Sequence, residues 1–258
     1  MRPLRQVHPG MPARRPLAAG MIREHFEFRQ TIATILAGTP EEVAAATSGM
    51  LAARQEVERQ IALDPYFSAT FEPYTPASPG RTVGRMARAA AGAGVGPMAA
   101  VAGAIAWAGV EAMVEAGAAF GLVDNGGDIA LVSDREVKIG VYAGASPLSG
   151  RIAFLLPPQN EILGICTSSA TVGPSISLGI ADAVTVFSPD VAVADAWATA
   201  ICNRIGADDT SVLDTLPGTG VTGVLAIIND AVIRWGDLPA VVRAKVDERL
   251  ITAGRSPL

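Results

Sequence analysis

Two oxygen-bearing side chains, Asp195 and Thr199, lie four positions apart in the run ADAWAT. In a helix, residues at this spacing project from the same face, about one turn apart. A carboxylate and a hydroxyl placed in this way can hold Mg²⁺, which takes oxygen ligands and shares its coordination sphere with phosphates and water. The alternative is that Asp195 caps or hydrogen-bonds locally while Thr199 packs in the core.

A glycine-rich segment, with Gly92, Gly94 and Gly96 at alternate positions, leads into Pro97. Proline suits the first position of a helix, where its missing N–H costs nothing. Free N–H groups at a helix start favour an anion such as phosphate. The segment therefore predicts a loop and a helix start that bind a phosphate-containing small molecule.

The run DNGGD follows a predicted strand at residues 120–123 and contains Asn125, Gly126, Gly127 and Asp128. Glycines allow the backbone to approach a ligand closely, while the polar side chains supply acceptors. This combination favours a ligand-binding turn. The alternative is that Asn-Gly-Gly is only the turn of a hairpin.

A hydroxyl-rich run begins at Thr167 and includes Ser168, Ser169 and Thr171. Its residues lack the hydrophobic period of a helix or strand, so a loop is expected at 167–177. Such an uncharged polar loop suits a ligand cradle, although a plain surface loop has the same composition. Cys166, directly before the run, is a candidate nucleophile or sulfur-handling thiol, or else a buried and inert cysteine.

The composition limits the classes of partner. The 258 residues carry a net charge of −5, and no basic face is implied, so we expect no nucleic acid partner. Two cysteines give no disulfide framework, which favours a reducing, cytoplasmic compartment. The second half contains no histidine, which argues against a Ser-His-Asp or Cys-His site built there.

No membrane partner is expected either. Residues 1–20 are rich in arginine and proline without an apolar core, which predicts a disordered leader rather than a secretory signal. Residues 89–110 carry no charge, but they are mostly alanine and glycine, which suits a helix buried among close neighbours better than a membrane span. An apolar composition is compatible with a homodimer.

The order of elements predicts the fold class. Strands are expected within 23–37 and at 120–123, 130–132, 137–142, 152–156, 163–167, 183–187, 221–228 and 231–235. Helices are expected at 39–63, from 81, from 97 and from 188 to about 204, with an amphipathic tail near 239–250. Consecutive mid-chain strands favour one α+β domain, residues 21–258, with mixed or antiparallel sheets packed with helices.

Four motifs in this order and spacing resemble the ApbE-like superfamily: GVGPMAAVAGAIA, VDNGGDIAL, CTSSATVGPSISLGIADAVTV and VADAWATAICN. The chain is most similar to the short, functionally uncharacterised branch related to the FAD:protein FMN transferases. The resemblance is strong over residues 81–204 and looser from Arg23. It implies an ApbE-like fold.

The resemblance also implies site residues. In the flavin transferases, an acidic residue and a threonine of the matching motif bind the divalent metal, which corresponds to Asp195 and Thr199. A backbone carbonyl near residues 94–96 is the implied third ligand. The matching Asn-x-Gly-Gly turn lies against the flavin nucleotide, FAD or FMN, and the hydroxyl run 167–169 is implied to lie in the same cleft.

The chain departs from the family pattern at its acid–base positions. The histidine-containing segment of the transferases is absent, as is their lipoprotein signal. Related proteins of the short branch often have His where Pro174 stands and Lys where Ile180 stands. Asp182 is then the nearest candidate acid or base.

Two hypotheses of function follow from these patterns. The first is an enzyme that binds a flavin or adenine nucleotide with Mg²⁺, such as a flavin or nucleotidyl transferase or a pyrophosphate-cleaving enzyme. The second is a non-catalytic ligand-binding or accessory protein that keeps the cleft without the proton-transfer residues. Members of the short branch are linked to sulfur assimilation, which would give Cys166 a role.

Overall fold

The computed structural model describes residues 20–171, 179–246 and 252. The strands are β1 Ile22–Phe28, β2 Thr31–Ala37, β3 Phe120–Asn125, β4 Asp128–Ser133, β5 Val137–Gly140, β6 Ile152–Leu156, β7 Gln159–Ser168, β8 Ala183–Ser188, β9 Gly223–Ile228, β10 Ala231–Gly236 and β11 Ala240–Arg243. The helices are α1 Pro40–Leu63, α2 Tyr66–Ala69, α3 Arg81–Ala93, α4 Val101–Glu115 and α5 Val191–Arg204, with 3-10 turns η1 Pro97–Ala100 and η2 Ser211–Thr215.

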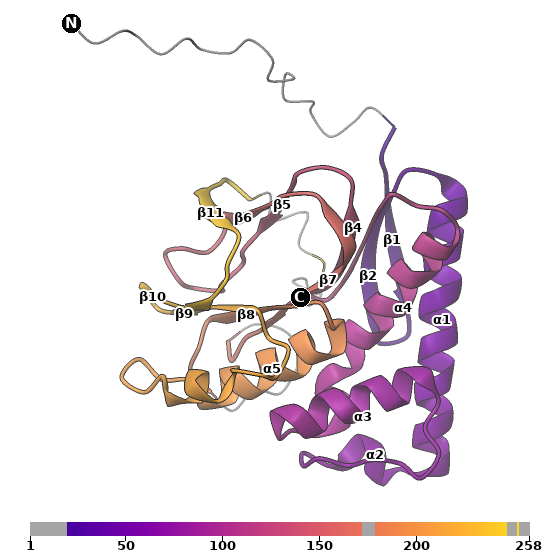
Figure 1. Ribbon diagram of the computed structural model, residues 1–258, viewed down its shortest axis with the longest axis horizontal. Helices are drawn as coiled ribbons and strands as arrows, with labels where there is room; N and C mark the ends of the chain where they lie inside the picture. The colour runs from indigo at the N-terminus through magenta and orange to yellow at the C-terminus, as the bar shows by residue number, and fades with distance from the viewer. Residues whose placement is uncertain (1–19, 172–178, 247–251, 253–258) are drawn as a thin grey trace, which may run out of the picture.

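Two sheets and a layer of helices build the fold (Figure 1). The larger sheet has eight strands in the order β1-β2-β3-β4-β7-β8-β9-β10, and the smaller has the order β11-β6-β5. Every neighbouring pair of strands is antiparallel. The predicted α+β class with antiparallel sheets packed with helices is therefore confirmed.

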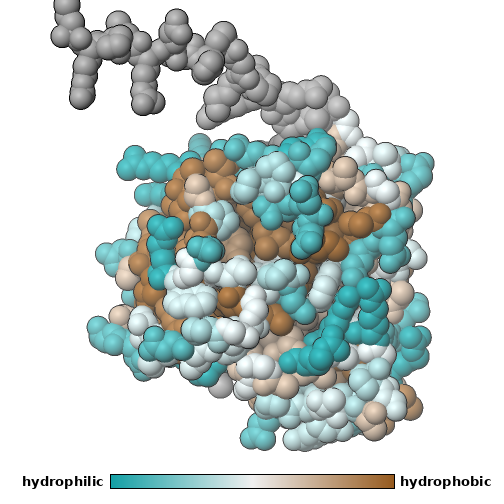
Figure 2. All heavy atoms as spheres, in the orientation of Figure 1, coloured by the Kyte–Doolittle hydropathy of each residue, from teal (hydrophilic) through white to brown (hydrophobic). Residues whose placement is uncertain are grey.

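The larger sheet is covered on both faces, because side chains alternate along a strand. On β8, Val184 and Val186 pack with the helices, while Ala183 and Phe187 pack with the small sheet. Phe187 meets Phe154 of β6 edge-to-face, with ring centroids 4.9 Å apart. Seen from outside, apolar surface gathers where Figure 1 places β5, β6 and β11, ringed by polar residues (Figure 2).

Small residues allow the helices to pack closely. A Cβ at Gly49 of α1 would overlap the carbonyl oxygen of Ala108 in α4, and one at Gly164 of β7 would lie 2.7 Å from Cα of Val191 in α5. Within the described residues, Pro97–Glu115 is the one segment long and apolar enough to cross a membrane, and half of it is buried. It packs between α1 and β3–β4, so the expectation of a buried core helix fits its contacts.

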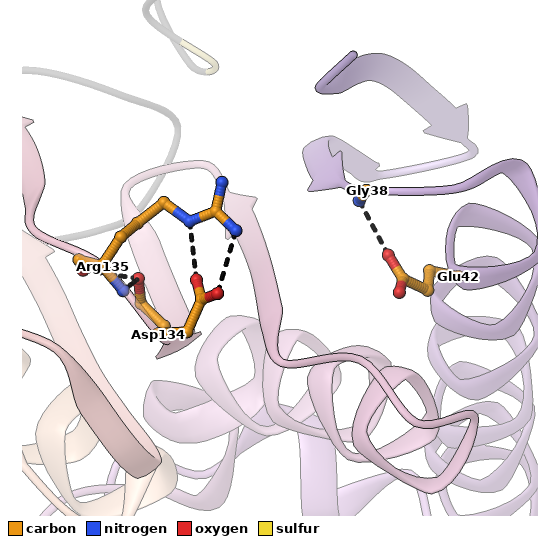
Figure 3. A network of polar contacts seen from close by, with 5 residues as sticks. Gly38, Glu42, Asp134 and Arg135 are labelled. Carbon is orange, nitrogen blue, oxygen red and sulfur yellow. Dashed lines mark hydrogen bonds and ion pairs between the residues drawn. The ribbon is translucent and has the colours of Figure 1, made fainter. Parts of the chain in front are cut away.

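Helix α1 begins where the sequence indicates. The hydroxyl of Thr39 accepts from the N–H of Glu42 at 3.2 Å, while the Glu42 carboxylate accepts from the N–H groups of Gly38 and Thr39. Figure 3 shows the contact with Gly38. This capping box satisfies N–H groups that the first helical turn leaves without a partner.

Two sequence-based expectations differ from the structure. Gly92 lies in α3 and not in a loop, because α3 ends only at Gly94, which adopts the left-handed conformation of a helix C-cap (φ +72°). The tail near 239–250 contributes strand β11, whose register on β6 is set by sheet pairing that local amphipathicity does not reveal. Most of the predicted leader, Pro174 and much of the loop 167–177 lie outside the described residues.

Candidate functional site

Asp195 is positioned by α5, which begins at Val191 because the Asp190 side chain caps it by accepting from the N–H of Val193 at 3.0 Å. Asp195 is buried, and its Oδ2 accepts from the N–H of Gly103 at 2.8 Å. The backbone N–H groups of Gly103 and Ala102 lower the pKa of this carboxyl, against the larger effect of burial. Because α4 has no side-chain cap of its own, Asp195 acts as that cap from another helix.

Asn125, at the end of β3, contacts the same turn of α4. Its Nδ2 donates to the carbonyl of Ala102 at 3.0 Å. Asp195 and Asn125 therefore meet on two successive residues of α4, Ala102 and Gly103. The ADAWAT helix, the DNGGD segment and the helix that follows the glycine-rich segment converge at this point.

The DNGGD segment is a two-residue hairpin turn between β3 and β4. Gly126 and Gly127 both have positive φ, +71° and +105°, as such turns require. Asp124 Oδ1 accepts from the N–H of Gly127 at 2.8 Å, which fixes the turn. The backbone of this segment is therefore that of a hairpin turn, which was the alternative to a ligand-binding turn. Asn125 and Asp128, on either side of the turn, pair across β3 and β4.

Asp128, Cys166 and Asp195 form a cluster between the sheet and α5. Asp128 stands opposite Cys166 in the β4–β7 ladder. Burial raises the pKa of Asp195 from 3.8 to about 7. Burial, followed by the charges of Asp195 and Asp124, also raises the pKa of Asp128. The cluster is therefore a region of low polarity that disfavours excess negative charge.

Cys166 is fully buried in this cluster. Its Sγ donates to the carbonyl of Val191 at 3.6 Å. Burial first, and then the charges of Asp128 and Asp195, raise the pKa of the thiol well above its usual value. Because the thiolate is the nucleophilic form, this geometry favours the inert alternative for Cys166.

The glycine-rich segment serves chain packing. A Cβ at Gly96 would overlap the carbonyl oxygen of Thr70. Pro97 opens the short turn η1, and α4 starts only at Val101. A phosphate was predicted at the helix start at Pro97. In the structure the first turn of α4 is capped instead by Asp195, which accepts from the N–H of Gly103.

The hydroxyl run is divided between the two faces of the sheet. Thr167 bonds Thr185 across β7–β8, with oxygen atoms 2.9 Å apart, on the face that packs against the small sheet. Ser168 is two positions from Cys166 and so shares its helix-side face. Ser169 Oγ accepts from the N–H of Thr171 at 3.0 Å in the following turn. Thr167 therefore points away from Asp195.

Asp182, the predicted acid or base, is bound into the scaffold. Its Oδ2 accepts from the N–H of Asn229 at 2.6 Å, and its Oδ1 accepts from Thr171 Oγ1 at 3.4 Å. The side chain is buried. It therefore joins the start of β8 to the β9–β10 turn.

A pocket of about 550 Å³ opens beside Asn125, between the β1–β2 turn, α1 and the first turns of α4. Its polar lining comprises Arg29, Gln30, Thr31, Arg54, Glu58 and Asn125. Its apolar wall includes Val57, Ile61, Met98, Val101 and Ile105. Asn125, which was predicted to bind a ligand, lines this pocket.

Comparison with known proteins identifies the family. The family model described as "AbpE bacteria" matches residues 14–219. The chain is 82% identical to a UPF0280 protein of Methanoculleus marisnigri over 234 residues, 91% of this chain and 96% of that relative. It is 59% identical to a UPF0280 protein of Methanosphaerula palustris, over 91% and 99% of the two chains. The chain belongs to the ApbE-like superfamily.

The solved structure of a Thermotoga maritima protein supports this ApbE-like fold. The ApbE protein of Thermotoga maritima matches with a TM-score of 0.54 and 13% identity, over 83% of this chain and 96% of that one. The Pseudomonas stutzeri flavinyl transferase ApbE in its apo form matches with a TM-score of 0.48 and 14% identity, over 91% and 98%.

The donor set of this ApbE-like protein suits Mg²⁺. Asp195 and Asp128 offer carboxylate oxygens, and Thr199 follows Asp195 by one turn of α5. Among the residues that the structure describes, no group of three or more His, Cys, Asp or Glu side chains is arranged to hold a metal. Mg²⁺ does not require one, since one or two carboxylates completed by phosphates and water suffice.

Sequence reasoning missed the charged residues of the pocket. Arg54 and Glu58 have the i, i+4 spacing of a helical ion pair, which was a visible signal in the predicted helix 39–63. Arg29 has a positive φ of +54° at the β1–β2 turn. No sequence signal marks Arg29, because arginine is not a typical residue for that conformation.

Proposed function

We propose that this ApbE-like protein binds a flavin or adenine nucleotide together with Mg²⁺ where the pocket adjoins the first turn of α4. The observation that carries the proposal is that Asp195 and Asn125 bind adjacent residues of α4. Asp195 accepts from the N–H of Gly103, and Asn125 donates to the carbonyl of Ala102. Asn125 and Ala102 also line the pocket. The motifs that resemble the flavin transferases supply these residues.

The pocket lining suits the ring of a nucleotide. Val57, Ile61 and Ile105 give an apolar wall, and a mostly apolar pocket with a few polar groups is typical of small-molecule sites. The amide of Asn125 lies at the α4 end of this wall. In the proposed complex the ring contacts the wall and the phosphates extend toward α4.

Asp195, Asp128 and Thr199 would hold the metal, which would offset the phosphate charge and polarise a P–O bond. Asp195 also has a structural role, since its carboxylate accepts from the N–H of Gly103 and caps α4. Asn125 donates to the carbonyl of Ala102, the residue before Gly103 in the same turn. Metal binding and pocket shape are therefore coupled through one turn of helix.

A second candidate function is non-catalytic binding. Asp182 was predicted for proton transfer and Cys166 for nucleophilic attack. The Asp182 carboxylate accepts from the N–H of Asn229 in the β9–β10 turn, and the Cys166 thiol is buried with a raised pKa. This arrangement favours an accessory protein that binds a nucleotide without transferring it.

Calorimetry with FAD, FMN and ADP, each with and without Mg²⁺, tests the proposal. We expect Mg²⁺-dependent binding by the wild type and its loss in Asp195→Asn. The matched control is Asp190→Asn, which removes a carboxylate from the start of the same helix but keeps a side chain able to cap it. Equal Mg²⁺-dependent binding by wild type and Asp195→Asn contradicts the metal role.

Incubation with FAD, Mg²⁺ and a threonine-containing acceptor protein separates the two candidate functions. Release of AMP together with covalent flavin on the acceptor supports a transferase. Reversible binding without AMP release supports the accessory protein. Mass spectrometry of the purified protein additionally identifies any nucleotide that it carries.

A further inference from the structure

We propose that Arg29 exchanges partners when the pocket is filled: it leaves the carboxylate of Glu58 and binds a phosphate group of the ligand. Glu58 then determines specificity, because a ligand has to offer Arg29 a better partner than a carboxylate. That the ligand carries a phosphate rests on the proposed function, whereas the exchange itself is a property of these side chains. The exchange takes place on the side of the pocket formed by α1 and the β1–β2 turn.

The first observation is a carboxylate shared between two guanidinium groups. Oε1 of Glu58 lies 2.8 Å from Nη1 of Arg29 and 3.0 Å from Nε of Arg54. All three side chains line the pocket, and its other lining residues are uncharged. Two positive charges and one negative charge leave the lining with an excess of positive charge, which attracts an anionic ligand.

The second observation is that the two arginines are held to different degrees. The Arg54 side chain is 12% exposed. Besides its bond to Glu58, its Nη1 donates to Oγ1 of Thr31 at 2.6 Å and its Nη2 donates to Oε1 of Gln30. The Arg29 side chain is 59% exposed and is paired with Glu58. Arg29 is therefore the partner that can leave Glu58, and Arg54 is the partner that stays.

The third observation is that the turn that carries Arg29 is anchored. Arg29 and Gln30 form the two-residue turn between β1 and β2, since Phe28 pairs with Thr31. Arg54 binds the side chains of Gln30 and Thr31 and so fixes this turn against α1. The exchange therefore requires only rotation of the Arg29 side chain, which is fast for an exposed residue.

The exchange is favourable for a phosphate and not for a carboxylate. An ion pair between exposed side chains is weak, because water and salt screen it. A terminal phosphate carries more negative charge than a carboxylate and has three acceptor oxygens, and a guanidinium can bind it through two parallel N–H groups. The Glu58 carboxylate left behind keeps a partner, because Arg54 still donates to it. A ligand whose anionic group is a carboxylate offers Arg29 no more than Glu58 already does.

Removal of the competing charge tests the proposal. Calorimetry of the full chain measures the dissociation constants of ADP with Mg²⁺ and of pyrophosphate without a metal, for wild type, Glu58→Gln, Arg29→Asn and the double variant. Glutamine keeps an acceptor oxygen for Arg54. We expect Glu58→Gln to bind both probes about fivefold more tightly than the wild type, because Arg29 no longer has to leave a carboxylate. The gain should disappear in the double variant, since it acts through Arg29.

Glu56→Gln is the matched control. Glu56 lies two positions before Glu58 on α1, and its carboxylate accepts from the N–H of Val83 at 2.8 Å. It is not among the described residues that line the pocket. The same loss of charge at Glu56 should therefore leave both dissociation constants unchanged. Thermal unfolding of each variant checks that the chain is folded.

Three results would overturn the proposal: a Glu58→Gln variant that binds neither probe more tightly than the wild type, a gain that persists in the double variant, or an equal gain in Glu56→Gln. The two probes also separate this proposal from the proposed function. Tighter pyrophosphate binding by Glu58→Gln, in a protein without Mg²⁺-dependent ADP binding, would support the exchange and contradict the nucleotide function. Mg²⁺-dependent ADP binding without a gain for either probe would support the nucleotide function and contradict the exchange.

Discussion

Gly103 of α4 and Asp195 of α5 are in direct contact, and this contact requires both residue types. The N–H of Gly103 donates to Oδ2 of Asp195 at 2.8 Å. A Cβ at position 103 would lie 2.8 Å from Cβ of Asp195 and 2.9 Å from the carbonyl oxygen of Val191. A glycine is therefore required for α5 to come close enough for its carboxylate to cap α4.

The first prediction concerns Gly103→Ala. The added methyl group forces α4 and α5 apart, and such overpacking costs about 1–3 kcal/mol, reduced by up to about 1 kcal/mol because alanine favours a helix. We expect a net loss of about 1–2 kcal/mol in urea unfolding, together with weaker Mg²⁺-dependent nucleotide binding.

Gly92→Ala is the control for this substitution. Gly92 lies in α3, and a Cβ there would meet no atom within 4 Å. The same change should stabilise the protein by up to about 1 kcal/mol. If both alanine variants gain stability, the close contact at Gly103 does not limit the packing of α4 on α5.

The second prediction is a dependence of stability on pH. Burial raises the pKa of Asp195 from 3.8 to about 7. Between these values the folded chain keeps a proton that the unfolded chain has lost, so the free energy of unfolding falls as pH rises through this window. Asp195→Asn should flatten this part of the profile. A profile of the variant that parallels the wild type from pH 4 to pH 7 would show that Asp195 titrates normally.

Local interactions explain what could be predicted from the sequence. Thr39 and Glu42 form a capping box, Asp190 caps α5, and Gly126-Gly127 makes a hairpin turn. Each depends on residues within three or four positions, so the residue types identify it. The period of two along β7 also separates Cys166 from Thr167, although the hydroxyl run was predicted to lie in one cleft.

Contacts between distant residues explain what could not be predicted. The cap of α4 comes from Asp195, 92 positions after Gly103, and no local pattern identifies it. The constraint at Gly96 comes from the Thr70 carbonyl, so a glycine that suggested a ligand loop serves packing. Arg29 reaches the pocket only because β1 and β2 form a hairpin beside α1.

The third prediction concerns Arg29, whose φ of +54° is matched by Asn229, φ +55°, in the two-residue turn between β9 and β10. Asparagine tolerates this conformation, whereas a long side chain is strained there by about 1 kcal/mol. Arg29 also forms a 2.8 Å ion pair with Glu58, and its side chain is 59% exposed. An ion pair this exposed contributes about 0–1 kcal/mol.

Arg29→Asn should therefore leave stability unchanged or slightly higher, and Asn229→Arg should lower it by about 1 kcal/mol. Because the guanidinium lines the pocket, we expect Arg29→Asn to weaken binding of an anionic nucleotide by about tenfold. Urea unfolding and calorimetry measure the two effects. A large loss of stability in Arg29→Asn would mean that Arg29 stabilises the fold and does not serve ligand binding.

The fourth prediction is that Cys166 is chemically inert in the folded protein. The thiol is fully buried, donates to the carbonyl of Val191 and has a pKa well above its usual value. At neutral pH it should resist a thiol-specific reagent until denaturant is added, and Cys166→Ala should bind nucleotide as the wild type does. Cys202 is also buried, so the assay is read in Cys202→Ala, where Cys166 is the remaining cysteine. Rapid stoichiometric labelling of that variant under native conditions would restore Cys166 as a candidate nucleophile, because it would require an accessible thiolate that this packing excludes.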